Sequence, residues 1–352
     1  MKTPFDPPVD PMLAKLTPAI PRDGGWLYEP KWDGFRCVAF FDGEELYLQS
    51  RDRKPLGRYF PELVEGLVSV LPGPAVLDGE IVVMTARGLD FDALQMRLHP
   101  AESRVRRLAA ETPAAFVAFD LLALGADDLR GRPLEDRRRA LEQFLAPAGP
   151  PIHLTPATTD PTVAADWFER FEGAGFDGVV AKRLDGRYQP GIRAMAKIKH
   201  LRTADCVVGG FRWNRGEEGR SVGSLLLGLH DVEGTLHFVG HTSSFSAVEK
   251  RALVERLRPL VAGGEGDGFG AGRTPGEPSR WSQGKDLSWV RLRPELVCEV
   301  TFDHLQGPRF RHAATFKRWR VDKAPTGCTF EQLEAPVPFE LSLVFAREAP
   351  GG

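Results

Sequence analysis

The amino-acid sequence predicts a two-domain α+β protein. Its 352 residues are enough for about two domains of ordinary size. In the first part of the chain, short apolar runs bounded by turn residues alternate irregularly with stretches of helical periodicity. After about residue 200 the pattern changes to short strands joined by tight turns. We therefore expect a first domain over residues 1–202 and a second over residues 203–352.

The first domain is expected to combine antiparallel strands with helices. Apolar runs predict strands over Arg36–Phe41, Glu45–Gln49, Ala75–Met84, Ala115–Leu124 and Gly178–Lys182. Helical spacing predicts helices over Asp90–Leu98, Leu134–Leu145 and Ala164–Ala174. Asp78-Gly79 is expected to form a turn just before Glu80.

The second domain is expected to be a small β-barrel. Short strands are predicted over Cys206–Arg212, Ser224–His230, Thr235–His241 and Leu296–Thr301, with one helix over Ala247–Leu260. Several strands and a single helix within one such domain favour an OB-fold.

Composition limits the classes of function. The chain is 42% hydrophobic and 27% charged, as in an ordinary globular protein, and its net charge of −2 gives no overall attraction to nucleic acid. A local basic stretch nevertheless runs from Arg309 to Lys323. The four cysteines lack zinc-ligand spacing, so we expect reduced core residues in a cytoplasmic protein. No signal peptide or long apolar run is present, so we expect no membrane association.

The stretch from Glu29 to Arg36, EPKWDGFR, contains the most informative lysine. Lys31 follows an expected strand end and precedes Asp33-Gly34, a turn signal that presents the ammonium outward. A free lysine titrates near ~10.4 and is then a poor nucleophile, but nearby cations and partial desolvation lower that pKa. On these residues alone, a surface lysine before a turn is an equally open interpretation.

Further motifs give the chain a family resemblance. The stretch Lys31–Arg36 resembles the first motif of the covalent nucleotidyltransferases, which include DNA ligases, RNA ligases and mRNA capping enzymes. Stretches resembling the other motifs of that superfamily follow in the same order: Ser50–Asp52, Leu77–Glu80, Phe116–Asp120, Asp177–Lys182, Lys197–Lys199 and Arg320–Lys323. The resemblance covers Pro11 to about Pro325, and it implies an adenylation (nucleotidyltransferase) domain followed by the OB-fold domain.

The resemblance implies a role for each matching residue. Lys31 would attack the α-phosphate of ATP and form a lysyl–AMP. Glu80 and Asp177 would hold Mg²⁺, with Glu80 alternatively contacting the ribose, and Phe119 would stack on adenine. The family more often has glutamate at the position of Asp177. The remaining nucleotide-binding residues would be Glu29, Arg36, Arg51, Lys182, Lys197, Lys199, Arg320 and Lys323, the last two orienting pyrophosphate. For each of these residues taken alone, core packing or surface charge is the alternative.

Within the superfamily the chain is similar to the minimal bacterial ATP-dependent ligases called ligase C. Only 30 residues precede Lys31, and the stretches Val9–Ala14 and Lys199–Val208 also resemble that group. The resemblance implies a monomeric DNA ligase that seals nicked duplex DNA and works with DNA repair proteins. An RNA ligase and an mRNA-capping-type guanylyltransferase remain enzyme alternatives, and a nucleic-acid-binding OB module is the non-enzyme alternative.

Overall fold

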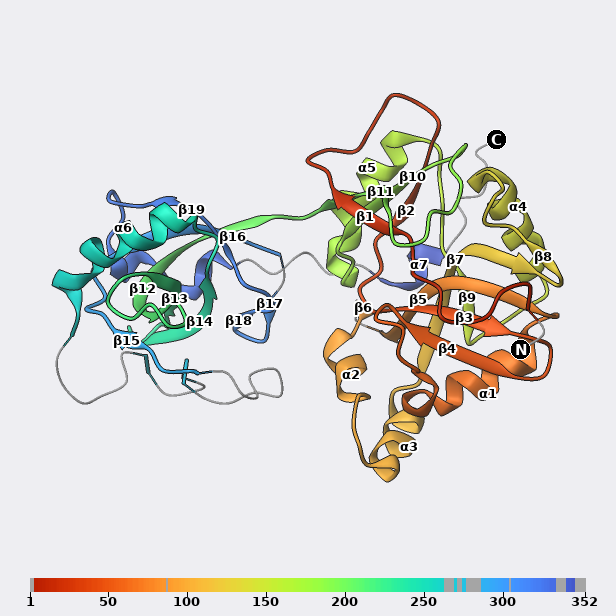
Figure 1. Ribbon diagram of the computed structural model, residues 1–352, viewed down its shortest axis with the longest axis horizontal. Helices are drawn as coiled ribbons and strands as arrows, with labels where there is room; N and C mark the ends of the chain where they lie inside the picture. Colours follow the sequence, from red (N-terminus) through yellow and green to blue (C-terminus); the bar gives the residue numbers. More distant parts are fainter. Residues whose placement is uncertain are drawn as a thin grey trace. The chain divides into compact units, whose positions relative to one another are not determined.

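The computed structural model describes residues 3–86, 88–262, 269–270, 274–276, 286–303, 305–333 and 340–345. The chain forms two compact units (Figure 1). The first comprises Met1–His200 with Pro336–Gly352, and the second comprises Leu201–Ala335. Residues 340–345 therefore belong with the first unit, whereas the sequence predicted a single domain over 203–352. The reason is apolar packing, because Leu341 and Val344 join a buried cluster around Trp32.

A seven-stranded sheet forms the centre of the first unit. Its main path is β4-β3-β5-β7-β8, β6 pairs with β5, and β9 pairs with β7 in the single parallel contact of this sheet. On β3, Cys37 and Ala39 enter one core cluster while Val38 and Phe40 enter another, so both faces of the sheet are covered. The strands are β3 (Phe35–Phe41), β4 (Leu46–Ser50), β5 (Ala75–Thr85), β6 (Gly88–Leu89), β7 (Ala114–Leu124), β8 (Asp127–Asp128) and β9 (Ile152–Leu154).

A smaller four-stranded sheet packs against one face of the first. Its order is β1-β11-β10-β2, antiparallel except for the β1–β11 pair. Val38 and Phe40 of β3 share a buried cluster with Met195 of β11, which joins the two sheets. The strands are β1 (Leu13–Leu16), β2 (Trp26–Pro30), β10 (Gly178–Arg183) and β11 (Arg193–Lys199).

Helices cover the outer parts of the first unit. The predicted helix Leu134–Leu145 is confirmed as α4, and the other two predicted helices correspond to α2 (Phe91–Met96) and to α5 (Pro161–Arg170) with the short η2 (Phe171–Ala174). The sequence analysis missed η1 (Gly57–Tyr59), α1 (Pro61–Val70) and α3 (Glu102–Glu111). Leu63 and Leu67 are buried on α1, one helical turn apart.

The expected turn at Asp78-Gly79 is wrong, because both residues lie inside the continuous strand β5. Gly79 is needed for close packing rather than for a turn. A Cβ at this position would collide with the ring of Phe116 and with the carbonyl oxygen of Val117 on the neighbouring strand β7. The uninterrupted strand leaves Glu80 directly opposite Arg36 on β3.

The second unit is a curved antiparallel sheet of the OB-fold type with its own core. The sheet order is β14-β13-β12-β16-β19, with β15 beside β12 and a separate β17–β18 ribbon. The two edge strands meet at the bridge between Thr242 and Ala314, which partly closes the barrel. The elements are β12 (Arg202–Trp213), β13 (Val222–His230), β14 (Leu236–Thr242), α6 (Ala247–Leu257), η3 (Arg258–Leu260), β15 (Val290–Arg291), β16 (Val297–Phe302), β17 (Leu305–Gln306), β18 (Arg309–Phe310), β19 (Thr315–Trp319), η4 (Pro325–Gly327) and η5 (Phe330–Gln332).

Two further features bear on the sequence analysis. The cysteines are free and buried, as expected: Cys37, Cys206, Cys298 and Cys328. In the part of the chain that the structure describes, no helix is both long and apolar enough to cross a membrane.

A buried ion pair between α4 and β7 gives a stability prediction. Arg137 and Asp120 are 1% and 2% exposed and share two hydrogen bonds of 2.8 and 2.9 Å. Arg137→Met leaves a buried carboxylate without its counter-ion, so we expect a loss of about 3–5 kcal/mol in the free energy of unfolding. Urea unfolding of the variant and of the unsubstituted protein measures this loss.

The matched control is Arg106→Met, because the side chains of Arg106 and its partner Glu102 are each 75% exposed. An exposed pair of this kind contributes at most about 1 kcal/mol. Equal losses for the two variants would contradict the assignment of Arg137 as a buried structural cation.

Candidate active site

Lys31 lies immediately after β2, at the edge of the four-stranded sheet. Its backbone N–H donates to the carbonyl of Gly178 at 2.8 Å, and its carbonyl accepts from the N–H of Asp177 at 3.0 Å. These two bonds extend the β2–β10 ladder and fix the lysine beside Asp177. Gly178 has a φ of 128°, and a Cβ there would collide with the carbonyl of Ile198 on β11. Only glycine therefore allows β10 to lie this close to β11.

Asp177 binds two lysine ammonium groups. Its side chain is 4% exposed, and it forms ion pairs with Lys31 and, at 2.8 Å, with Lys199. Lys197 lies two residues before Lys199 on β11, opposite Val180 of β10. Burial, followed by the positive charges of Lys199 and Lys31, lowers the pKa of Lys197. Three lysines thus surround one carboxylate, and their excess positive charge suits an anionic ligand such as a phosphate.

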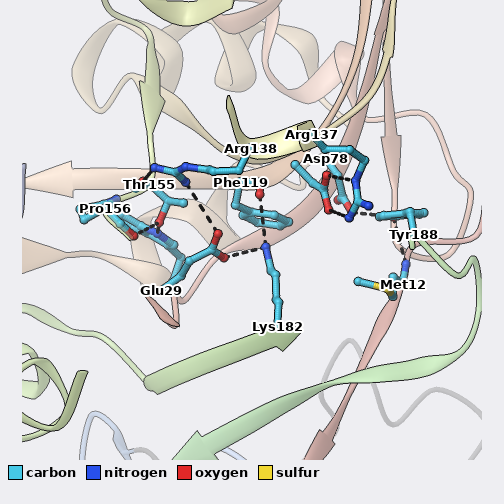
Figure 2. A network of polar contacts seen from close by, with 12 residues as sticks. Met12, Glu29, Asp78, Phe119, Arg137, Arg138, Thr155, Pro156, Lys182 and Tyr188 are labelled. Atoms are coloured by element: carbon cyan, nitrogen blue, oxygen red, sulfur yellow. Dashed lines mark hydrogen bonds and ion pairs between the residues drawn. The ribbon is translucent and has the colours of Figure 1, made fainter. Parts of the chain in front are cut away.

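Arg36 is held in place by a buried polar network. Its guanidinium donates two hydrogen bonds of 2.6 Å to Asp78, and the hydroxyl of Tyr188 donates to the same carboxylate at 2.6 Å. The N–H of Met12 donates to the Tyr188 oxygen at 3.0 Å. Figure 2 shows Asp78, Tyr188 and Met12 in this chain of contacts. The network fixes Arg36 against one wall of the site.

Glu80 is the second carboxylate beside the lysine. Burial raises the pKa of Glu80 to about 7, although the cations Arg36 and Lys31 act to lower it. Among the described residues, no group of three or more His, Cys, Asp and Glu side chains could hold a metal by itself. Two carboxylates near Lys31 nevertheless fit Mg²⁺, which usually takes one or two carboxylates together with substrate phosphates and water.

A second ion pair lies beside Phe119. Lys182 and Glu29 are each 3% exposed and 2.6 Å apart, and the Lys182 ammonium also donates to the Phe119 carbonyl at 3.2 Å. The cations of Lys182 and Arg36 lie 4.5 and 4.4 Å from the centre of the Phe119 ring. Figure 2 shows Glu29 between Lys182 and Arg138. Lys182 is therefore a buried lysine rather than an exposed one at a strand end.

Two atoms beside this pair lack hydrogen-bond partners. Glu29 Oε1 and Arg138 Nη1 are buried, and they lie 3.8 Å apart, beyond hydrogen-bond distance. A buried polar atom without a hydrogen bond costs free energy, so these two ion-paired atoms are candidates for contact with a ligand. The available groups are one carboxylate oxygen, which accepts, and one guanidinium N–H, which donates.

The remaining predicted residues lie apart from this cluster or are paired elsewhere. Arg51 is exposed after β4, yet its charge contributes to the lowered pKa of Lys197. Arg320 belongs to the second unit, where it binds Asp205 at 2.8 Å and Asp322 at 2.9 Å. Lys323 also contacts Asp205, at 3.3 Å. Carboxylate oxygens therefore already occupy donors of both cations.

Sequence reasoning missed residues that hold the site together. Asp78 lies in the motif Leu77–Glu80, where the sequence predicts a turn. Tyr188 and Arg138 lie outside every motif. A signal existed only for Asp78, because a carboxylate inside an apolar run needs a buried partner. Nothing local to Tyr188 or Arg138 indicates their long-range contacts.

Comparisons with known proteins identify the family of the chain. The family described as "ATP dependent DNA ligase domain" matches residues 11–199, and "ATP dependent DNA ligase C terminal region" matches residues 218–323. DNA ligase C2 of Mycolicibacterium smegmatis is 54% identical over 99% of this chain and 100% of its own length. The multifunctional non-homologous end joining DNA repair protein LigD of Mycobacterium tuberculosis is 33% identical over 90% of this chain, which covers 39% of that longer protein.

A solved structure from a study of Lig E DNA ligases has a TM-score of 0.57 to this chain. It is 19% identical and the match covers 88% of this chain and 99% of that one, so it shows the fold alone. Two family matches over most of the chain, together with a relative of 54% identity along its full length, define the family. The chain belongs to the ATP-dependent DNA ligases, in a group similar to mycobacterial ligase C.

Proposed function

We propose that this chain uses ATP to seal breaks between a 5′-phosphate and a 3′-hydroxyl in duplex DNA, through an AMP adduct on Lys31. The observation that carries the proposal is the position of Lys31. Its ammonium pairs with Asp177 among the charges of Lys197 and Lys199, in a chain that belongs to the ATP-dependent DNA ligases.

In the first step, Nζ of Lys31 attacks the α-phosphorus of ATP. An N–P bond forms, the bond from the α-phosphorus to the bridging oxygen breaks and its electrons leave with pyrophosphate, and the protons lost from the nitrogen pass to water. Because Nζ of Lys31 is held by Asp177 in an ion pair, this contact must be released before the attack. The ammonium groups of Lys197 and Lys199 stabilise the negative charge that grows on the phosphate oxygens. Mg²⁺, when bound, would be held by Asp177 and Glu80 and would add positive charge at the phosphates.

In the second step, the 5′-phosphate of the nick attacks the adduct and releases the Lys31 amine, which gives a DNA-adenylate. In the third step, the 3′-hydroxyl attacks this activated phosphate and expels AMP. We propose that Arg320 and Lys323 leave Asp205 to orient pyrophosphate in the first step. Contacts from Arg320 Nη1 and Lys323 Nζ to phosphate oxygens would replace their contacts to the Asp205 carboxylate.

We propose that Glu29 and Phe119 bind the adenine base. Phe119 would stack on the base once the base displaces Arg36 or Lys182 from its ring, and Glu29 Oε1 is a buried acceptor without a hydrogen bond. The exocyclic amino group of adenine is a donor, whereas guanine has a carbonyl at the same position. This difference favours ATP over GTP and therefore favours a ligase over a guanylyltransferase. A nucleic-acid-binding OB module would have no use for the lysines gathered around Asp177 in the first unit.

The working context of the enzyme also belongs to the proposal. Nicked duplex DNA is the substrate, and a monomer working with DNA repair proteins in the cytoplasm is the simplest arrangement. The support is that a relative is named as an end joining DNA repair protein and that the cysteines are free and buried, as in reduced compartments.

Lys31→Ala tests the nucleophile. We expect that label from α-labelled ATP and Mg²⁺ is lost from the variant, whereas Lys54→Ala, which changes an exposed lysine, keeps it. Label from GTP would favour the capping-type reaction. A folded, unsubstituted protein that takes up label from no nucleotide would sink the enzyme proposal and leave the binding module.

Glu29→Gln tests nucleotide choice. Because the amide also offers a donor, we expect the preference for ATP over GTP to fall by at least about tenfold. The readout is the ratio of the two adduct-forming rates, which cancels general damage to the site. Glu142→Gln is the matched control, since Glu142 binds Arg138 from the half-exposed side. An unchanged ratio in Glu29→Gln would rule out this role.

The pKa of Glu80 predicts a pH dependence of stability. The pKa is about 7 in the folded protein against an ordinary value of 4.5, so the folded state keeps a proton that the unfolded state releases between these values. Stability is therefore lost as pH rises through this window. Relative to the unsubstituted protein, Glu80→Gln should gain in free energy of unfolding from pH 5 to 7 and stay level above.

Urea unfolding at several pH values measures this difference. Glu44→Gln, which changes an exposed carboxylate, should follow the unsubstituted protein throughout. If Glu80→Gln also follows it, the carboxyl of Glu80 is ionised across the whole range and its pKa is not raised.

A further inference from the structure

Residues 340–345 form a small apolar cap on the first unit. Leu341 is 7% exposed and Val344 4% exposed, and both lie in the cluster that contains Trp32 and Phe176. The ring of Phe345 stacks on Trp32 with a centroid distance of 5.5 Å and an interplanar angle of 28°. This segment includes α7 (Ser342–Phe345) and lies beyond residue 323, where the second family match ends.

Trp32 directly follows Lys31, and its indole is held on several sides. The indole N–H donates to the hydroxyl of Thr155 at 2.8 Å, and the ring lies 4.6 Å from that of Phe176. Phe345 also covers the indole, and Trp32 is 5% exposed. The indole is thus a fixed anchor one residue away from the nucleophile.

The aromatic residues Trp32 and Phe176 flank the ion pair between Lys31 and Asp177. Lys31 pairs with Asp177, while the next residue, Trp32, contacts Phe176, the residue before Asp177. The aromatic contact and the ion pair therefore join the same two chain segments. Removing the ring of Phe345 opens a void beside Trp32, and the surroundings of such a void relax only in part. Any shift of the indole passes through one peptide unit to Lys31.

We propose that residues 340–345 are a positioning element for the first step of ligation, with Phe345 acting through Trp32 on Lys31. This inference rests on the proposed role of Lys31 as nucleophile. The positioning role affects the first step of the reaction differently from the later steps. The attack of Lys31 on ATP depends on the exact place of its amine, whereas sealing of DNA that already carries AMP does not use that amine as nucleophile. Lys182 bonds to Glu29 and to the Phe119 carbonyl, whereas Phe345 stacks on Trp32 and lies 5.0 Å from the ring of His153.

Phe345→Ala and Phe345→Tyr test the proposal in the full-length chain. We expect Phe345→Ala to slow single-turnover formation of the AMP adduct by about ten- to a hundredfold, since a misplacement near 1 Å can have that effect. ATP binding and sealing of pre-adenylated nicked DNA should stay within about twofold. Phe345→Tyr keeps the ring and should restore the rate. Equal slowing of both reactions, or adduct formation at the unsubstituted rate in Phe345→Ala, would overturn the proposal.

A second measurement does not depend on the proposed function. Acylation of Lys31 by an amine-reactive reagent, relative to that of the exposed Lys54, is followed by mass spectrometry in the absence of nucleotide. Phe345→Ala should loosen the Lys31–Asp177 pair and change the relative rate at Lys31 at least about threefold. If the unsubstituted protein forms no AMP adduct, the proposed function fails, while this rate still tests the positioning. An unchanged relative rate would overturn it.

Discussion

The site depends on one buried carboxylate that binds two lysines. Asp177 pairs with Lys31 and Lys199, and its position follows from the backbone bonds between Lys31 and residues 177–178. Those bonds in turn need a glycine at 178. The contact with Asp177 therefore positions Lys31 and Lys199 beside each other. Any ligand that draws Asp177 away, or that brings phosphate charge to the lysines, changes these ion pairs.

The polar groups around the site form two sets: groups that are hydrogen-bonded to one another, and buried atoms that lack a hydrogen bond. Arg36, Asp78 and Tyr188 bond to one another, so this wall is rigid before any ligand binds. Glu29 Oε1 and Arg138 Nη1 are buried without hydrogen bonds. These two atoms lie 3.8 Å apart in an ion pair that gives neither of them a hydrogen bond.

Local sequence patterns predicted elements whose signals are local. The apolar spacing of Leu134–Leu145 gave a helix with the observed bounds, and the motif order indicated the residues around Lys31. Asp78-Gly79 misled because the glycine serves contact with Phe116 on another strand. Tyr188 reaches Asp78 across 110 residues, and Phe345 reaches Trp32 from the far part of the chain. Contacts of this kind depend on three-dimensional packing, which no spacing rule contains.

The most direct measurement is to locate the AMP on the protein. The purified chain is incubated with ATP and Mg²⁺, digested, and its peptides are analysed by mass spectrometry. The account predicts the adduct on Lys31 and on no other lysine, because Lys197 and Lys199 bind phosphate charge and Lys182 is paired with Glu29. An adduct on Lys182, Lys197 or Lys199 would contradict the assignment of Lys31 as the nucleophile.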